Sequence, residues 1–498
     1  MERTATAWAK TAIKTFLDGL KAQISLVEET KDIMRCRQQL LELWLSQHRH
    51  GAGVDAVEVL DGMRYIFNDR MTVLIQRQAQ LLQNVGALVG ETMKNWRPGV
   101  SDDLTSLWSA KMTSIETSNG ARVFRSTLGN LLAGKNETLL HVLSPYMDWL
   151  RGIQVTEEEI EVSKIIKWDE NIDEMDDMDE LLDDKQMLLS EDDPLQLQHA
   201  LRENLSVAFA ELEKLLSTSA SDLQPEHRGH QAVFILRVIR EIRMHQPASH
   251  RSAPLGENLV PKLFSNIAVA ALGKPYETCS KRLDKHSHST NFPARALWEG
   301  APEIPVLPSP WAYRLLMQLT QSMAGFGADV WSSDAVKTLK AEALAQLIKL
   351  LERKPESPIP STNGVVHGDH KPEAVINGDD QGDAKSGQDE TESIEDDRES
   401  TNDATSTEQA QTNGKVVAAV DSRQTLEFLR ERNTQKLFDV LYLSNALSVS
   451  DTSISKDMER VQKSLLEDIS LDVKVTERMK KGAVEYWRRT SLLFGLLA

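Results

Sequence analysis

The densest group of metal-ligating side chains lies in the acidic stretch WDENIDEMDDMDELLDDKQMLLSEDDP, which ends at Pro194. Counted from Asp169, its spacing follows the calcium loop of EF-hand proteins. Oxygen-bearing side chains occupy positions one, three, five, nine and twelve: Asp169, Asn171, Asp173, Asp177 and Glu180. Position six holds Glu174, where that loop needs a glycine for its sharp turn. We therefore interpret the stretch as a solvated acidic linker, with calcium regulation as the less favoured hypothesis.

Two histidine-rich stretches are further candidates for metal binding, HRH at residues 48–50 and HSHS at residues 286–289. Neither has a cysteine or carboxylate partner at ligand spacing, which favours surface loops. The chain also contains no GxxxxGK[ST] loop, GxGxxG turn, GxSxG elbow or HExxH helix. The sequence thus predicts a protein that is not an enzyme and that carries no cofactor and no metal.

Basic clusters in RVIREIR and RMKKGAVEYWRR are candidate phosphate contacts, for lipid or for nucleic acid. The formal net charge of −18 comes from two acidic tracts, because residues 168–193 contribute −12 and residues 361–414 contribute −11. The rest of the chain is then near +5, which is not strongly basic. We interpret the basic clusters as solvated helix faces and expect no nucleic-acid partner.

The composition is that of a leucine-rich helical protein, with 40% hydrophobic and 5% aromatic residues in 498. No leader pattern and no apolar run of about 18 residues occurs. Cys36 and Cys279 form no CxxC pair or disulfide framework, so a reducing compartment is expected. The predicted fold class is all-α, built of elongated helical bundles with acidic disordered insertions.

An N-terminal bundle of long helices is expected over residues 1–165. Apolar residues in alternating steps of four and three predict one long helix from Ile13 to Leu45. A second helix is expected from Ala56 to Gly90, and the chain breaks at residues 97–99. The GALVG pattern at residues 86–90 indicates close packing of two helices.

An acidic linker over residues 166–193 is expected to separate this bundle from a second one over residues 194–354. The stretch AVFILRVIREIRMH predicts a buried helix. Its three arginines, Arg237, Arg240 and Arg243, are expected on the solvated side.

The second bundle contains a proline-rich strap at residues 300–310. Its prolines are Pro302, Pro305, Pro308 and Pro310. Prolines so spaced predict an extended external segment, close to polyproline II. Ser309 should cap the next helix, with Pro310 in its first position. Trp298 and Trp311 flank the strap and are its candidate anchors.

Residues 355–415 are rich in Asp, Glu, Ser, Thr, Asn and Gly and poor in large apolar side chains, which predicts a disordered acidic linker. A C-terminal helical segment is expected over residues 416–498. Its stretch TLEFLRERNTQKLFDVLYLSNAL carries an apolar face, on which Leu437 and Leu441 are candidate partner contacts or strap anchors.

Two stretches resemble a known family. LWEGAPEIPVLPSPWAYRLLMQLTQSMAGFGADVWSSDAVKTLK is similar to the C-terminal region of the first subunit of the conserved oligomeric Golgi complex in filamentous fungi. RNTQKLFDVLYLSNAL resembles a later helix of that subunit, with its Gln-x-Leu-x-Asp-x-x-Tyr-Leu pattern. The resemblance covers about residues 290–345 and 425–447.

The resemblance implies a non-catalytic tether subunit in a rod of stacked helical bundles, acting in vesicle tethering and retrograde transport within the Golgi. Its implied partners are the other subunits of the complex, with SNAREs and small GTPases reached through the complex. The implied location is the cytosol and the cytoplasmic face of the Golgi membrane, held peripherally. The family's N-terminal segment is absent, which suggests a fragment or partial gene model. Another vesicle tether or a generic helical scaffold is the alternative.

Overall fold

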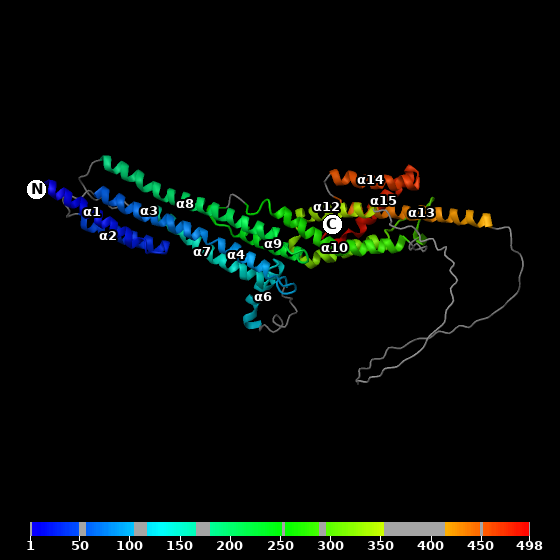
Figure 1. Ribbon diagram of the computed structural model, residues 1–498, viewed down its shortest axis with the longest axis horizontal. Helices are drawn as coiled ribbons and strands as arrows, with labels where there is room; N and C mark the ends of the chain where they lie inside the picture. Colours follow the sequence, from blue (N-terminus) through cyan, green and yellow to red (C-terminus); the bar gives the residue numbers. More distant parts are fainter. Residues whose placement is uncertain are drawn as a thin grey trace, which may run out of the picture. The chain divides into compact units, whose positions relative to one another are not determined.

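The computed structural model describes residues 2–48, 56–103, 117–165, 180–250, 254–287, 295–352, 414–448 and 452–497. Within these ranges the regular structure is helical, and the one strand-like pair is an isolated bridge between Glu299 and Ile304. The expected all-α helical-bundle fold is confirmed. Figure 1 colours the helices in chain order, from α1 in blue to η4 in red.

The chain divides into two compact units, which differ from the predicted domains. The first unit joins Met1–Glu352 to Thr434–Ala498, and the second is Arg353–Asn433. No boundary falls at residue 194, because helix α8 runs unbroken through Pro194. Asp193, expected in a solvated linker, is buried and accepts two hydrogen bonds from the guanidinium of Arg64. Arg64, which is distant in the sequence, thus holds the end of the acidic tract against the first unit's other helices.

Four helices open the first unit. They are α1 (Glu2–Ile24), α2 (Thr30–His48), α3 (Ala56–Gln80) and α4 (Gln83–Lys94). The expectation of one helix from Ile13 to Leu45 is therefore wrong, since a turn separates α1 from α2. The guanidinium of Arg70, on α3, donates to the carbonyl of Val27 in this turn at 3.0 and 2.6 Å. The apolar spacing continues across the turn, so periodicity alone did not reveal it.

Helix α4 packs closely against α8 through the predicted GALVG pattern. A Cβ at Gly86 would lie 2.6 Å from Leu215 Cδ1 and 3.2 Å from Leu212 Cδ1, closer than carbon atoms can approach without a shift. A Cβ at Gly90 would lie 3.6 Å from Ser219 Oγ, which is ordinary contact. The interpretation of this pattern as close helix packing is confirmed.

The middle of the first unit is arranged around α7. The elements here are α6 (Thr117–Leu132), α7 (Glu137–Ile165), α8 (Glu180–Ser221), α9 (Arg228–Met244) and η1 (Ala248–His250). Two polar rings on α7 fix its position: Tyr146 donates its hydroxyl proton to the carbonyl of His245 at 2.9 Å, and Trp149 donates its indole N–H to that of Gln78 at 2.8 Å. Helix α7 therefore contacts both α3 and the end of α9.

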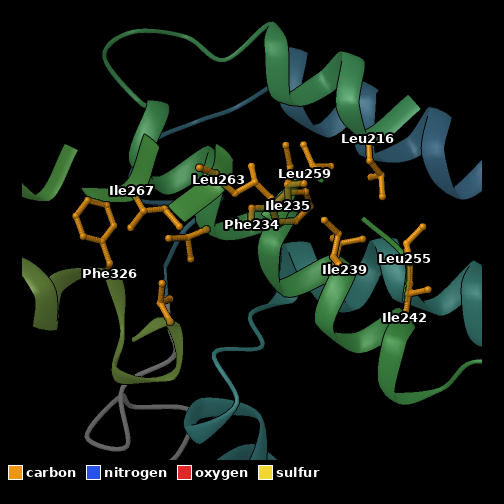
Figure 2. Close-up of a cluster of buried hydrophobic side chains, with 14 of the residues drawn as sticks. Leu216, Phe234, Ile235, Ile239, Ile242, Leu255, Leu259, Leu263, Ile267 and Phe326 are labelled. Carbon is orange, nitrogen blue, oxygen red and sulfur yellow. The ribbon is translucent and has the colours of Figure 1, made fainter. Parts of the chain in front are cut away.

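The next elements are η2 (Arg295–Leu297), η3 (Ala328–Val330), α10 (Val260–Ser287), α11 (Pro310–Phe326) and α12 (Ser333–Glu352). Figure 2 shows the core in this region, to which Ile235 and Ile239 of α9 contribute together with Leu259 and Leu263. The predicted helix after the strap is confirmed. Its expected core residues, Leu315, Leu316, Leu319 and Met323, are all buried.

The chain ends with α13 (Gly414–Ala446), α14 (Thr452–Ile469), α15 (Val473–Thr490) and η4 (Ser491–Phe494). Phe438 and Tyr442 of α13 are fully buried, and the Tyr442 ring packs edge-on against Tyr486 and Trp487 of α15. The predicted disorder of 355–415 falls almost wholly on residues 353–413, outside the described residues.

Candidate functional site

The proline-rich segment 300–310 begins with a tight turn. Glu299 and Ile304 exchange backbone hydrogen bonds of 3.0 and 3.1 Å, and the Ala301–Pro302 peptide is cis. Gly300 adopts φ +93°, and a Cβ there would lie 2.9 Å from the guanidinium of Arg478. This part of the strap therefore turns back on itself, and the expectation of an extended segment from residue 300 is wrong.

The later part of the strap is also not external, although residues 300–303 are exposed. Ile304, Pro305, Pro308 and Ser309 are buried. Arg478 of α15 donates a hydrogen bond to the carbonyl of Pro302, which attaches the turn to the C-terminal helices. Sequence pattern could show that this segment is stiff, but it could not show what covers it.

Asp439 of α13 accepts hydrogen bonds from the end of the strap. The backbone N–H of Ser309 donates to Asp439 Oδ1 at 2.7 Å, and the Ser309 hydroxyl donates to Oδ2 at 2.6 Å. Ser309 does precede Pro310, the first residue of α11, as predicted, but its side chain makes no capping hydrogen bond to that helix. Ser309 is thus the N-cap residue of α11, as predicted, but its hydroxyl donates to the buried Asp439 carboxylate instead of accepting from the helix.

Gln435 completes this contact from one turn earlier on α13. Its Nε2 donates to the carbonyl of Leu307 at 2.9 Å and to Asp439 Oδ1 at 3.1 Å. Both side chains are buried, with 2% and 1% of their residue surface exposed. We call Leu307, Ser309, Gln435 and Asp439 the strap junction. It joins two segments of the first unit that lie about 130 residues apart in the sequence.

Burial dominates the electrostatics of the strap junction. It raises the pKa of Asp439 to about 7, even though hydrogen bonds from Ser309, Gln435 and the Trp311 indole favour the charged form. The hydrogen-bond donors of this carboxyl group all come from the chain itself, so the group is placed to hold two segments together.

The candidate anchors Trp298 and Trp311 lie at the two ends of the strap. Trp311 is half-buried against the core and adds the indole hydrogen bond to Asp439. Trp298 is also half-buried, and the guanidinium carbon of Arg295 lies 4.6 Å from its ring centre. Their role as anchors stays a prediction.

The candidate residues Leu437 and Leu441 lie inside the first unit. Leu437 is 1% exposed and Leu441 is 6% exposed, and both belong to its hydrophobic core. In this structure they therefore stabilise the packing of α13 and present no surface to a partner protein.

A second polar junction joins α9 to the turn after α11. Arg237 donates to the Asp329 carboxylate through Nη2 at 2.7 Å and Nε at 2.9 Å, and Arg240 donates to it through Nη1 at 2.9 Å. Burial alone would raise the pKa of Asp329, but the hydrogen bonds and charges of these arginines outweigh it and hold the pKa below its ordinary value. The expectation that these arginines face solvent is wrong, because a buried carboxylate pairs with them.

Glycine is required beside this second junction. Gly327 adopts φ +100°, and a Cβ there would lie 2.6 Å from both Arg237 Nη2 and Asp329 Oδ1. Arg243, the third arginine, donates through Nε to the carbonyl of Leu255 at 2.7 Å. Arg237, Arg240 and Arg243 of α9 therefore all form contacts within the chain.

One small pocket brings serine, histidine and aspartate together. His230 Nδ1 lies 3.0 Å from Asp102 Oδ2, and Ser101 lines the same pocket. The Ser101 hydroxyl accepts a hydrogen bond from the Arg97 backbone N–H at 3.0 Å. The cavity volume is about 20 Å³, room for about one water molecule. The arrangement thus suits a structural contact better than a substrate site.

Among the residues that the structure describes, no group of three or more His, Cys, Asp or Glu side chains could hold a metal ion. The EF-hand-like residues Asp169 to Asp177 lie outside the described residues, and Glu180 is the first residue of α8. Of the HRH stretch, His48 is the last residue of α2, while Arg49 and His50 lie outside the described residues.

Sequence reasoning missed Asp329, Gln435 and Asp439, and it gave other roles to their partners Ser309, Arg237 and Arg240. Gln435 and Asp439 stand four residues apart among apolar neighbours of α13, so polar side chains at core positions were an available signal. No comparable signal marks their partner Ser309, whose role depends on a distant helix.

Comparison of the chain with protein-family models, with curated proteins and with solved structures gave no match.

Proposed function

We propose that this chain is a non-catalytic structural subunit of the conserved oligomeric Golgi complex, acting in vesicle tethering and retrograde transport within the Golgi. The strap junction is the observation that supports this most. The two stretches that resemble the complex's first subunit, near residues 290–345 and 425–447, meet there through Ser309 and Asp439. Two separate resemblances that fall on contacting segments are more specific than either stretch alone.

The buried polar groups form hydrogen bonds and ion pairs between distant parts of the chain, which supports a scaffold role. Asp439 binds the strap, and Asp329 pairs with Arg237 and Arg240. These groups join elements that are distant in the sequence, which suits a protein that presents stable helical faces to partners. The proposal includes no cofactor.

The proposed partners are the other subunits of the complex, with SNAREs and small GTPases contacted through the assembled complex and no nucleic acid. The proposed location is the cytosol and the cytoplasmic face of the Golgi, where the protein is peripheral. In the part of the chain that the structure describes, no helix is long and apolar enough to span a bilayer.

The test is affinity purification of the tagged chain from its own cells, followed by mass spectrometry. We expect the other subunits of the Golgi complex to be recovered in similar amounts. The control bait carries the same tag on an unrelated helical protein at matched expression. Reciprocal purification on a second subunit of the complex should recover this chain.

Two other outcomes would reject the proposal. Recovery of the subunits of a different tether would assign the chain to that tether, and recovery of no tether subunit in either direction would favour a generic scaffold. Calcium regulation is tested separately by titration calorimetry, where heat of binding at micromolar to millimolar calcium would support it.

A further inference from the structure

Helix α6, cyan in Figure 1, has no buried side chain among its described ones. Its described side chains, residues 121–132, are all at least partly exposed. Phe124 is 44% exposed and Leu132 is 72% exposed. Large apolar side chains on a helix normally face a hydrophobic core. Those of α6 are exposed instead.

Most apolar residues of α6 nevertheless form one face, while Val123 lies away from it. This face consists of Ala121, Phe124, Leu128, Leu131 and Leu132, which are three or four residues apart except for the adjacent pair Leu131 and Leu132. Because an α-helix turns once in 3.6 residues, these positions share a stripe about 100° wide. We call Phe124, Leu128, Leu131 and Leu132 the apolar face of α6. None of the four is packed against the hydrophobic core of the described residues.

The rest of the helix is mostly polar and carries little charge, although it includes the exposed Val123. Among the 16 residues of α6, eight are Ser, Thr, Asn or Gly. The two charged residues are Arg122 and Arg125, and the helix contains no Asp or Glu. In a chain of net charge −18, this helix is thus locally +2.

This charge pattern favours binding to a negatively charged membrane surface. A negatively charged membrane attracts the two arginines, and no carboxylate on the helix opposes the attraction. An amphipathic helix with Phe and Leu on one face and a polar, acid-free face on the other binds in the plane of a bilayer interface. A helix of this length with two glycines is marginal in water, so burial of its apolar face would also stabilise it.

We propose that α6 binds a membrane surface containing anionic phospholipid, with its apolar face inserted among the acyl chains near the headgroups. The inference deepens the proposed function and rests on it, because it assigns peripheral membrane contact to a particular helix. Its test uses purified chain and synthetic vesicles, so its outcome is independent of which subunits copurify with the tagged chain.

The experiment is flotation of the full chain with vesicles of phosphatidylcholine and phosphatidylserine. We expect the chain to float with these vesicles. The double substitution Phe124→Ser with Leu132→Ser should weaken binding at least about tenfold, because two inserted apolar side chains are lost. Both side chains are exposed, so circular dichroism and melting of the unbound chain should not change.

A matched control places the same change elsewhere. Leu492 and Leu493, near the C-terminus, are 89% and 59% exposed. Leu492→Ser with Leu493→Ser should leave vesicle binding unchanged. Arg122→Gln with Arg125→Gln should weaken binding to anionic vesicles several-fold and have little effect on pure phosphatidylcholine.

Three results would overturn the proposal. The chain could fail to float with anionic vesicles, or the α6 double variant could float as well as the wild type. Equal loss in the Leu492 and Leu493 variant would show unspecific adsorption. If the α6 variant keeps vesicle binding but no longer copurifies with a sister subunit, the apolar face binds a protein groove instead.

Discussion

Asp439 shows how one residue couples folding to pH. Its pKa is raised to about 7 in the folded chain, against about 4 for an aspartate in an unfolded chain. Between these values the folded state binds more protons than the unfolded state. The contribution of Asp439 to stability is therefore full below about pH 4 and is lost as the pH rises towards about 7.

Substitution of Asp439 tests this account. Asp439→Ala should lower the free energy of unfolding by about 3 kcal/mol, because the buried N–H and hydroxyl of Ser309 lose their acceptor. Asp439→Asn should cost less and should remove the fall in stability between about pH 5 and pH 7, because the amide does not titrate in this range. Urea denaturation followed by circular dichroism at both pH values measures these effects.

Asp468→Asn is the control, since Asp468 is exposed on α14 and the charge change is the same. It should alter neither the stability nor its pH dependence. An Asp439→Asn variant that retains the wild-type pH dependence would show that another group titrates.

At the scale of elements, the strap is held by contacts at both of its ends. Arg478 contacts the turn at Pro302, while Gln435 and Asp439 hold Leu307 and Ser309. The tryptophans flank these contacts. Trp298 pairs with Arg295, and Trp311 lies against the core beside Asp439.

Removal of both rings, Trp298→Ala with Trp311→Ala, should detach the strap. We expect a loss of about 2–4 kcal/mol in unfolding free energy, since two half-buried rings leave gaps against their neighbours. Limited proteolysis should then cut within residues 299–309, and the melting temperature should fall. Trp8→Ala is the control, because Trp8 is 73% exposed on α1. An unchanged melting curve together with unchanged partner binding would refute the anchor role.

At the scale of the whole molecule, the first unit is built from two parts of the chain that are separated in the sequence by residues 353–433. Residues 434–498 belong to the same compact unit as residues 1–352. The contacts that join them include the strap junction, which closes the chain between Ser309 and Asp439 into a loop. A long loop adds only slowly to the entropy cost of such closure.

Deletion of residues 361–414 should therefore leave helical content, melting temperature and partner binding unchanged. The reason is compositional, because this stretch has few large apolar side chains to bury. Calorimetry and circular dichroism of the deletion variant check this. A second variant, in which a Gly/Ser stretch of equal length replaces residues 361–414, separates the effect of losing this sequence from the effect of shortening the connection. A large fall in melting temperature in both variants would show that the segment is structural.

Local sequence was sufficient to predict the helical class, the helix that follows the strap and the core residues of that helix, α11. These depend on short-range periodicity and on local features, such as Pro310 at the first position of a helix. The resemblance also selected the two segments that meet at the strap junction.

Which polar groups are buried, and what they contact, depends instead on how distant helices pack. The turn between α1 and α2 receives Arg70, Asp193 pairs with Arg64, and the hydroxyl of Ser309 donates to Asp439. Each partner lies more than 40 residues away, so no local pattern encodes it. Burying a polar group costs free energy unless the group finds a hydrogen-bond partner, and here that partner is supplied only when distant helices pack together. These pairings hold the strap and the turn between α1 and α2 in place.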